Sequence, residues 1–212
     1  MKIAVVLEVV TCEKGDDVIE ALKGRGHEIF NAGMKKKEDK PELTYINTGL
    51  LSAILLNLKC VDFVIGGCGT GQGYFNSVLQ YPNVFCGHIL TPLDAWLFAR
   101  INAGNCISLM LTQGYGWASE VNLKNIFDKL FSEEFGLGYP ESRVETQALS
   151  RKRLAAISKK THYPFHEIIS NLDDEVLNPV LQFPGVVEML DIENREPEIK
   201  DAFKKRLAAL KI

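Results

Sequence analysis

Hydrophobic positions fall into short apolar runs that alternate with longer stretches of helical spacing. The apolar runs predict five strands, at Lys2–Val10, His27–Phe30, Val61–Ile65, Val84–Cys86 and Cys106–Leu111. The longer stretches predict helices at Val18–Lys23, Thr44–Asn57, Leu93–Asn102 and Ser119–Phe135. Continuous apolar strands that alternate with helices are typical of a parallel sheet covered on both faces. The pattern therefore predicts the α/β class, with a doubly wound parallel five-stranded sheet.

The last part of the chain follows a different pattern. From about Ser142 onward strand signals stop and helical spacing continues, with breaks expected at Pro164, Pro179, Pro184 and Pro197. We therefore expect an α/β domain over residues 1–160 and a helical extension over residues 161–212.

Two apolar stripes of helical spacing lie in this extension. One consists of Phe165, Ile168, Ile169 and Leu172, and the other of Phe203, Leu207 and Leu210. Short isolated helices are marginal in water, so both stripes must dock, either on their own core or on a partner subunit.

Charge and cysteine content exclude several classes of function. The 212 residues carry 24 Lys and Arg against 27 Asp and Glu, and a net charge of −3 offers no broad cationic surface for nucleic acid or anionic lipid. The apolar stretch near Leu50–Leu56 is too short to span a bilayer, and Glu8 interrupts the apolar start too early for a signal peptide. Five cysteines without a C-x-x-C motif suit free thiols in a reducing cytoplasm. We expect a cytoplasmic protein with no nucleic-acid or membrane partner.

The strongest functional signal is the sequence GGCGTGQG at residues 66–73, which follows the third predicted strand. In open α/β sheets, ligands bind beyond the carboxyl ends of the strands. Glycines let the backbone approach a ligand, and exposed N–H groups there would bind an anion or an oxyanion. The segment lacks the spacing of the dinucleotide fingerprint and the Lys-Ser/Thr pair of a P-loop, so NAD and ATP sites are disfavoured.

Cys68 lies inside this glycine-rich turn. A thiol near the start of a helix ionises readily, and the thiolate acts as a base or a nucleophile. The alternative is a small buried thiol that fills space beside a tight turn. Because of its position in the turn, Cys68 is the leading catalytic candidate.

Three segments resemble the ribose-5-phosphate isomerase B and galactose-6-phosphate isomerase family. They are MKIAV at the start of the chain, VDFVIGGCGTGQG at the third strand and ARINAGN near the fourth helix, and the resemblance covers about residues 1–150. It implies a Rossmann-like fold and an aldose–ketose isomerase of sugar phosphates that needs no metal or cofactor. It also implies a homodimer or a dimer of dimers.

The resemblance assigns the chemistry to the glycine-rich turn. Cys68 matches the family's proton-shuttling base, and Gly69, Thr70, Gly71 and Gly73 match the loop that holds the enediolate oxygens. In physical terms, a thiolate would remove the proton beside the carbonyl and backbone N–H groups would stabilise the oxyanion. The proton would then return to the adjacent carbon.

The other end of the implied site departs from the family. Asn102 and Asn105 match asparagines after the fourth helix, and Arg143 matches one phosphate-binding arginine. A second arginine is missing at Tyr139, and the histidine that opens the sugar ring falls at Ile101. A short sugar that closes no stable ring would not need that histidine, so four-carbon sugar phosphates are favoured over ribose 5-phosphate.

A further departure follows the first strand, where Glu8-Val9 replace the family's Asp-His pair. A carboxylate at the end of a buried strand is costly unless it is paired, so Glu8 is expected to bind a substrate hydroxyl, with a structural ion pair as the alternative. His88 is a candidate for the missing acid, and the alternative is a simply hydrogen-bonded histidine.

Other candidates have weaker support. His162 and His166 have i, i+4 spacing, but a proline lies between them and no carboxylate motif supports zinc, so no metal site is expected. Arg100 has equal prospects of reaching a phosphate or solvent. Tyr115 and Trp117 could wall the sugar pocket or pack at a subunit interface.

Together these features predict an aldose–ketose isomerase of a small phosphorylated sugar, such as a tetrulose or pentose phosphate. The alternative is a catalytically lapsed sugar-phosphate or anion-binding module that regulates a partner. Because family sites are built where two subunits meet, the extension at residues 161–212 is expected to wrap the partner and strengthen a homodimer. The alternative for the extension is packing on its own subunit.

Overall fold

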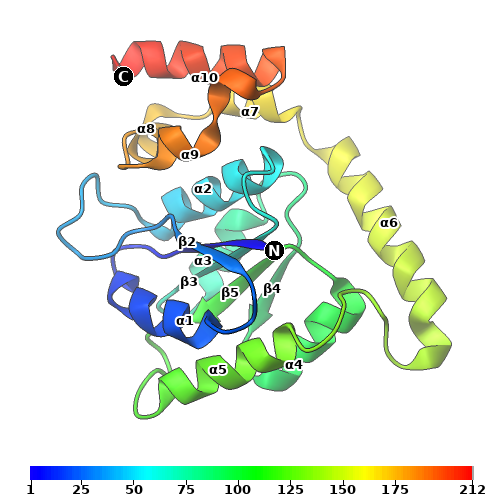
Figure 1. The fold of residues 1–212 in the computed structure, drawn as a ribbon. Coiled ribbons are helices and arrows are strands. Elements are labelled where there is room, and N and C mark those ends of the chain that lie inside the picture. Colours follow the sequence, from blue (N-terminus) through cyan, green and yellow to red (C-terminus); the bar gives the residue numbers. More distant parts are fainter. Residues whose placement is uncertain (212) are drawn as a thin grey trace.

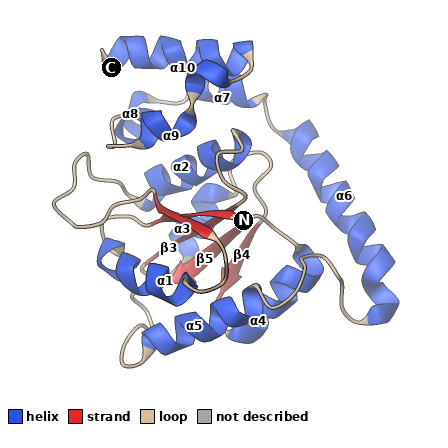
Figure 2. Ribbon diagram, viewed as in Figure 1, coloured by secondary structure: helices blue, strands red, loops and turns tan. Residues whose placement is uncertain are grey.

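A computed structural model describes residues 1–211 of the chain. Its centre is a five-stranded, all-parallel sheet with strand order β2-β1-β3-β5-β4 (Figures 1 and 2). The strands are β1 (Lys2–Val6), β2 (Glu28–Asn31), β3 (Phe63–Cys68), β4 (Cys86–Ile89) and β5 (Cys106–Met110). The predicted fold class is confirmed.

Helices cover both faces of the sheet, as the apolar strands require. One face carries α1 (Gly15–Leu22), α4 (Pro92–Leu97) and α5 (Ser119–Leu130), and the other carries α2 (Tyr45–Asn57) and α3 (Gln72–Val78) (Figure 1). Successive side chains of β1 point to opposite faces of the sheet. Ile3 and Val5 pack against α1, α4 and α5, whereas Ala4 and Val6 pack on the side of α2 and α3.

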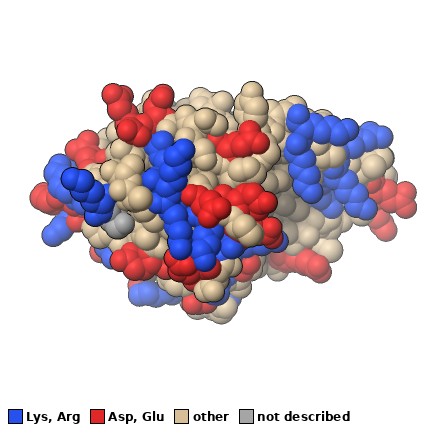
Figure 3. Space-filling view, turned by 90° about the horizontal axis from the view of Figure 1, so that it is seen from above, with Lys and Arg blue, Asp and Glu red and all other residues tan. Residues whose placement is uncertain are grey.

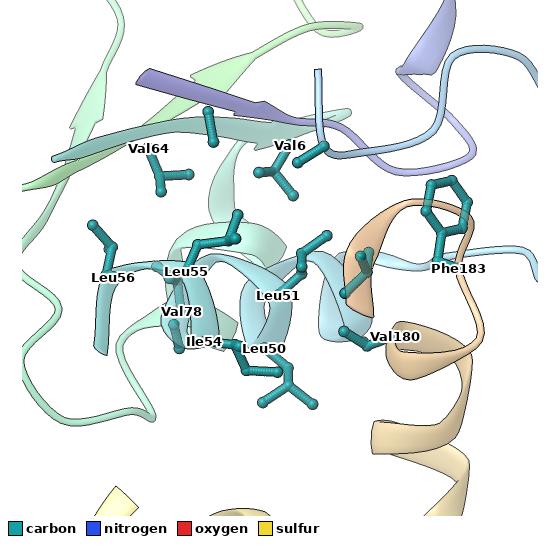
Figure 4. Close-up of a cluster of buried hydrophobic side chains, with 14 of the residues drawn as sticks. Val6, Leu50, Leu51, Ile54, Leu55, Leu56, Val64, Val78, Val180 and Phe183 are labelled. Carbon is teal, nitrogen blue, oxygen red and sulfur yellow. The ribbon is translucent and has the colours of Figure 1, made fainter. Parts of the chain in front are cut away.

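The helices of the C-terminal extension pack on their own subunit. They are α7 (Phe165–Asn171), α8 (Asp174–Leu181), α9 (Val186–Leu190) and α10 (Pro197–Leu210), and they form a third layer outside α2 (Figure 1). Leu55 of α2 lies against Val6 and Val64 of the sheet, while Val180 and Phe183 of the extension join the same buried cluster (Figure 4). The expectation that the extension wraps a partner is therefore wrong for α7–α10.

The reason lies in α2, which is apolar all round and so offers a second surface to bury. Polar contacts fix the docking: the Asn47 side chain donates to the carbonyl of Val176 (3.1 Å), and the Arg195 guanidinium donates to the carbonyl of Leu58 (2.8 Å). The two predicted stripes are used here, because Ile169 and Phe203 are both fully buried.

The helix that precedes the extension behaves differently. The 18-residue α6 (Val144–Thr161) contains no buried residue and stands away from the sheet (Figure 1). Basic side chains gather at its end of the molecule (Figure 3), and α6 supplies Arg151, Lys152, Arg153, Lys159 and Lys160.

Several elements differ from the sequence prediction: β1 ends at Val6 rather than Val10, β3 runs from Phe63 to Cys68 rather than from Val61 to Ile65, and α5 ends at Leu130 rather than Phe135. The fourth strand spans Cys86–Ile89 rather than Val84–Cys86, because the backbone N–H of Phe85 donates to the Asn105 side chain (2.9 Å) in the loop before the strand. His88 therefore lies inside β4. Pro179 does not break the helix but lies inside α8, near its end, where a missing N–H costs only one helical hydrogen bond.

Candidate active site

Cys68 is the last residue of β3, and its side chain is 6% exposed. The neighbouring strand β1 ends two residues before Glu8, and the pairing of Val6 with Gly66 brings the loop after β1 and the glycine-rich turn to the same edge of the sheet. The chain passes from β1 to β2 on one side of this point and from β3 toward β5 and β4 on the other. Such a switch point is where open α/β sheets bind ligands.

The carbonyl groups of the turn are held by the rest of the domain. The Gly69 carbonyl accepts two backbone N–H groups from the segment after β5 (3.0 and 2.9 Å), and the Gly71 carbonyl accepts the hydroxyl of fully buried Ser108 (2.6 Å). The Thr70 carbonyl accepts Nε2 of His88 (3.2 Å). Three consecutive carbonyls of the turn are thereby fixed.

Two backbone N–H groups of the same turn are free. The amides of Gly69 and Thr70, which directly follow Cys68, find no acceptor among residues 1–211. N–H groups that are positioned in advance stabilise negative charge on a substrate oxygen. The turn therefore places a thiol beside two donors suited to an enediolate.

The remaining positions of the turn have steric and polar roles. Gly71 has φ = +75°, and a Cβ there would lie 2.5 Å from Nε2 of His88, so only glycine fits. The Thr70 hydroxyl accepts the N–H of Gln72 (3.3 Å), and Gly73 packs under the ring of Tyr45.

Glu8 is 3% exposed, and its carboxyl group bonds to its own loop. One oxygen accepts the N–H of Val10 (2.8 Å) and the other accepts the hydroxyl of Thr11 (3.1 Å). Burial raises the pKa of Glu8, although these two hydrogen bonds oppose the rise. The carboxyl group thus shapes the loop after β1, and its assignment to a substrate hydroxyl stays a prediction.

An open cleft of about 700 Å³ runs along the free edge of β4, between that strand and α6. His88, Asp94, Asn102 and Arg143 line it. Asn102 and Arg143, which the sequence assigned to the substrate, are thus brought together here. His88 links the cleft to the turn, because its ring lines the cleft and bonds to Thr70.

Two other candidates are engaged in structural contacts. Asn105 precedes β5, at the end of the strand opposite to the Cys68 edge, and its side chain bonds to the backbone of Phe85 (2.9 Å) and Asn83 (2.8 Å). Arg100 forms an ion pair with Glu133 and lies over the ring of Trp96. The structure does not bring Asn105 to the Cys68 turn.

The remaining candidates lie outside the turn. The Tyr115 hydroxyl donates to Asp17 (2.6 Å), while Trp117 is fully exposed. His166 pairs with Glu167 (4.0 Å), and within residues 1–211 no group of three or more His, Cys, Asp or Glu side chains is arranged to hold a metal ion. All five cysteines are free thiols, as expected.

Sequence reasoning missed the contribution of Ser108. A serine inside the apolar strand Cys106–Met110 is a signal, because a buried hydroxyl needs a partner. The partner, the carbonyl of Gly71, is 37 residues away, so only the fold reveals it.

Comparison with known proteins finds a matching family. The sequence profile of the family described as Ribose/Galactose Isomerase matches residues 3–146. The chain belongs to this family. The resemblance seen in the sequence is confirmed.

Two solved structures are similar over almost the whole chain, including the C-terminal extension. One is a 4-deoxy-L-threo-5-hexosulose-uronate ketol-isomerase complexed with a tartrate, with 35% identity, a TM-score of 0.92, and coverage of 98% of this chain and 100% of that one. The other is the ribose-5-phosphate isomerase LacAB_rpiB from Vibrio parahaemolyticus, with 38% identity, a TM-score of 0.90, and coverage of 97% and 98%.

A third structure shows how far the shorter relatives extend. The ribose 5-phosphate isomerase of Thermotoga maritima has 25% identity and a TM-score of 0.57. The matched region is 69% of this chain and 96% of the Thermotoga maritima chain. No curated protein matches the chain.

No helix within residues 1–211 has the length and apolar character needed to cross a membrane. The family and these neighbours identify the protein as an enzyme, a sugar isomerase of the intramolecular oxidoreductase type.

Proposed function

We propose that this isomerase interconverts an aldose and a ketose of a small acidic sugar through the thiolate of Cys68. The observation that supports this proposal is the thiol at the end of β3, followed directly by the free N–H groups of Gly69 and Thr70. Gly71 and Gly73 complete the proposed loop around the enediolate, and their lack of a side chain leaves room for His88 and Tyr45.

The proposed reaction transfers one proton between adjacent carbons. The thiolate takes the proton from the carbon beside the carbonyl, and the C–H electron pair forms a C=C bond while the carbonyl oxygen becomes an enediolate oxygen. The N–H groups of Gly69 and Thr70 stabilise that oxygen. The thiol returns the proton to the former carbonyl carbon, and a hydroxyl proton passes between the two oxygens. Electrons balance within the substrate, so the proposed step includes no metal or redox cofactor.

For the substrate, we propose a small phosphorylated sugar such as a tetrulose or pentose phosphate. Arg143 in the cleft supports this choice, because its guanidinium is exposed and, within residues 1–211, bonds only to the nearby Thr146 hydroxyl (3.3 Å). Ile101 also lines the cleft and offers no proton for opening a ring. An open-chain phosphate sugar suits both observations.

A sugar carboxylate is the second candidate. Besides Arg143, the cleft is lined by Arg151, whose guanidinium is already bound to the carbonyls of Ile101 (2.8 Å) and Gly136 (3.0 Å). One free guanidinium matches the two oxygens of a carboxylate in a bidentate pair. The similar ketol-isomerase named above acts on a uronate, which carries such a group.

We also propose that the enzyme is a cytoplasmic homodimer and that α6 meets the partner subunit. Leu149, Leu154 and Ile157 on α6 are 46%, 52% and 53% exposed, and such apolar side chains on one helix need a covering surface. The strand β4 beside the cleft is an edge strand, which is also open to pairing.

A substrate panel tests the proposed function. Wild-type protein and Cys68→Ala are assayed with four-, five- and six-carbon aldose phosphates, ketose phosphates and a 5-keto uronate. We expect the wild type to isomerise one of these classes and Cys68→Ala to be slower by a factor on the order of 10² to 10⁴. Binding of these sugars without turnover by the wild type would contradict the proposal and favour the lapsed binding module.

A further inference from the structure

His88 is held between the glycine-rich turn and the cleft by two polar contacts. Its Nε2 lies 3.2 Å from the Thr70 carbonyl, and its Nδ1 lies 3.5 Å from Nε2 of Gln72. A carbonyl oxygen only accepts hydrogen bonds, so Nε2 carries the ring proton. Nδ1 is then free to accept from the Gln72 amide. The ring thus bridges the Thr70 carbonyl and the Gln72 side chain on the two sides of the turn.

Packing fixes the ring as firmly as these polar contacts do. The ring of Phe75 lies on one side, with ring centroids 6.0 Å apart. Gly71 lies so close that a Cβ there would stand 2.5 Å from Nε2 of His88. The ring therefore has little freedom to turn away from the Thr70 carbonyl.

The Thr70 carbonyl matters because it belongs to a planar peptide group that borders the free donors. The N–H at the other end of that group, on Gly71, donates to the Cys68 carbonyl (3.2 Å). The preceding peptide group, which carries the free N–H of Thr70, is held through the Gly69 carbonyl. Thr70 thus lies between two peptide groups that are both held by hydrogen bonds. Within residues 1–211, His88 is the only side chain that bonds to the peptide group between Thr70 and Gly71.

We propose that His88 is a positioning residue, which orients the free N–H of Thr70 toward the enediolate oxygen by holding the Thr70 carbonyl. This inference rests on the proposed function of the turn. It gives His88 a role distinct from that of an acid, because Nε2–H is engaged with a backbone carbonyl of the turn rather than directed at a substrate.

Two substitutions separate these roles. In His88→Gln the side-chain amide nitrogen occupies a position like that of Nε2 and can donate to Thr70, whereas in His88→Asn the amide is one bond shorter and cannot reach. We expect kcat of His88→Asn to fall by about 10- to 100-fold, because a displaced oxyanion donor weakens stabilisation of the transition state. We expect KM to change by less than about threefold and His88→Gln to retain kcat within about threefold.

The control is His166→Asn on α7, which is expected to match the wild type. Equal losses of kcat in His88→Gln and His88→Asn would overturn the inference, because an acid is lost in both. Unchanged kcat in both would overturn it as well. If His88→Asn does not fold, His88→Leu supplies the variant without a donor.

Amide hydrogen exchange over residues 66–73 gives a readout that needs no activity. We expect faster exchange in His88→Asn than in His88→Gln, whose exchange should match the wild type. Equal exchange in all three proteins would overturn the positioning role. Inactivity of the wild type toward every sugar would instead contradict the proposed function, and exchange would still test His88.

Discussion

In the glycine-rich turn, the backbone carbonyls hold the loop in place and two backbone N–H groups are left to bind a substrate oxygen. The carbonyls of Gly69, Thr70 and Gly71 are held by neighbouring groups, while the N–H groups of Gly69 and Thr70 stay free. An oxyanion site needs this division, because donors that are fixed before the reaction do not have to reorganise during it.

Glu8 shows how burial without a neighbouring positive charge raises the pKa of a carboxyl group. Its raised pKa means that the folded protein keeps a proton that the unfolded chain releases at lower pH. Stability from this group is therefore fully present below the unfolded pKa and is lost as pH rises through the folded one. Glu8→Gln mimics the protonated form and should remove that loss.

We expect urea unfolding to show equal stability of Glu8→Gln and wild type near pH 4 and a growing advantage of Glu8→Gln as pH rises toward 8. A matched control is Glu42→Gln, an exposed carboxylate next to the same loop. A constant difference between Glu8→Gln and wild type across this pH range would show that Glu8 is ionised in the folded protein.

Arg143 provides the residue-scale test of substrate charge. Arg143→Ala should raise KM for the acidic substrate by about 10- to 100-fold, since hydrogen bonds to a charged group contribute about 1.5 to 3 kcal/mol. A neutral analogue of the same sugar should show little change. Equal losses for the acidic and neutral sugars in steady-state assays would remove the anion-binding role.

At the scale of whole elements, the strand and helix order follows from the hydrophobic pattern, because buried strands and amphipathic helices differ in period. The glycine-rich turn is equally local, so Cys68 and its loop could be predicted. The fourth strand was misplaced because the side chain of Asn105 holds Phe85 in a loop. That contact, like those of Ser108 and His88, joins distant segments and leaves no periodic signal.

The docking of the extension was mispredicted for a related reason. An apolar stripe shows that a helix must be covered, but it does not show by which surface. Here α2 supplies that surface, and Asn47 connects the two layers. Asn47 also caps the start of α2, because its side-chain oxygen accepts the N–H of Thr44. The next residue, Tyr45, places its ring over Gly73 of the turn. The extension therefore supports the helix that borders the candidate site.

Leu177→Ala tests this integration. Leu177 is fully buried on α8, in the core cluster shared with the sheet, so its truncation should lower the free energy of unfolding by about 2 to 5 kcal/mol in a single transition. Leu93→Ala, at a 62% exposed position of α4, is the control and should stay within about 0.5 kcal/mol of the wild type. A Leu177→Ala protein as stable as the wild type would show that the extension is not part of the core.

At the scale of the whole molecule, α6 is a long helix that buries none of its residues. It projects from the domain, lines the cleft with Arg143 at its start, and carries exposed leucine and isoleucine side chains. Ile157→Glu should shift the proposed dimer toward monomer in light scattering, because a charge would be buried at the interface. Val121→Glu on α5 is the exposed control. A wild-type protein that is monomeric at high concentration would contradict the dimer.

Proton transfer by Cys68 is tested most directly by incubating the substrate with enzyme in deuterated water and following deuterium at its carbon atoms by NMR. Wild-type protein should incorporate deuterium at the carbon that gains the proton. Cys68→Ala should keep its fold and bind the sugar but incorporate essentially none, a loss on the order of 10² to 10⁴ in rate. Exchange by Cys68→Ala at the wild-type rate would contradict the thiolate mechanism.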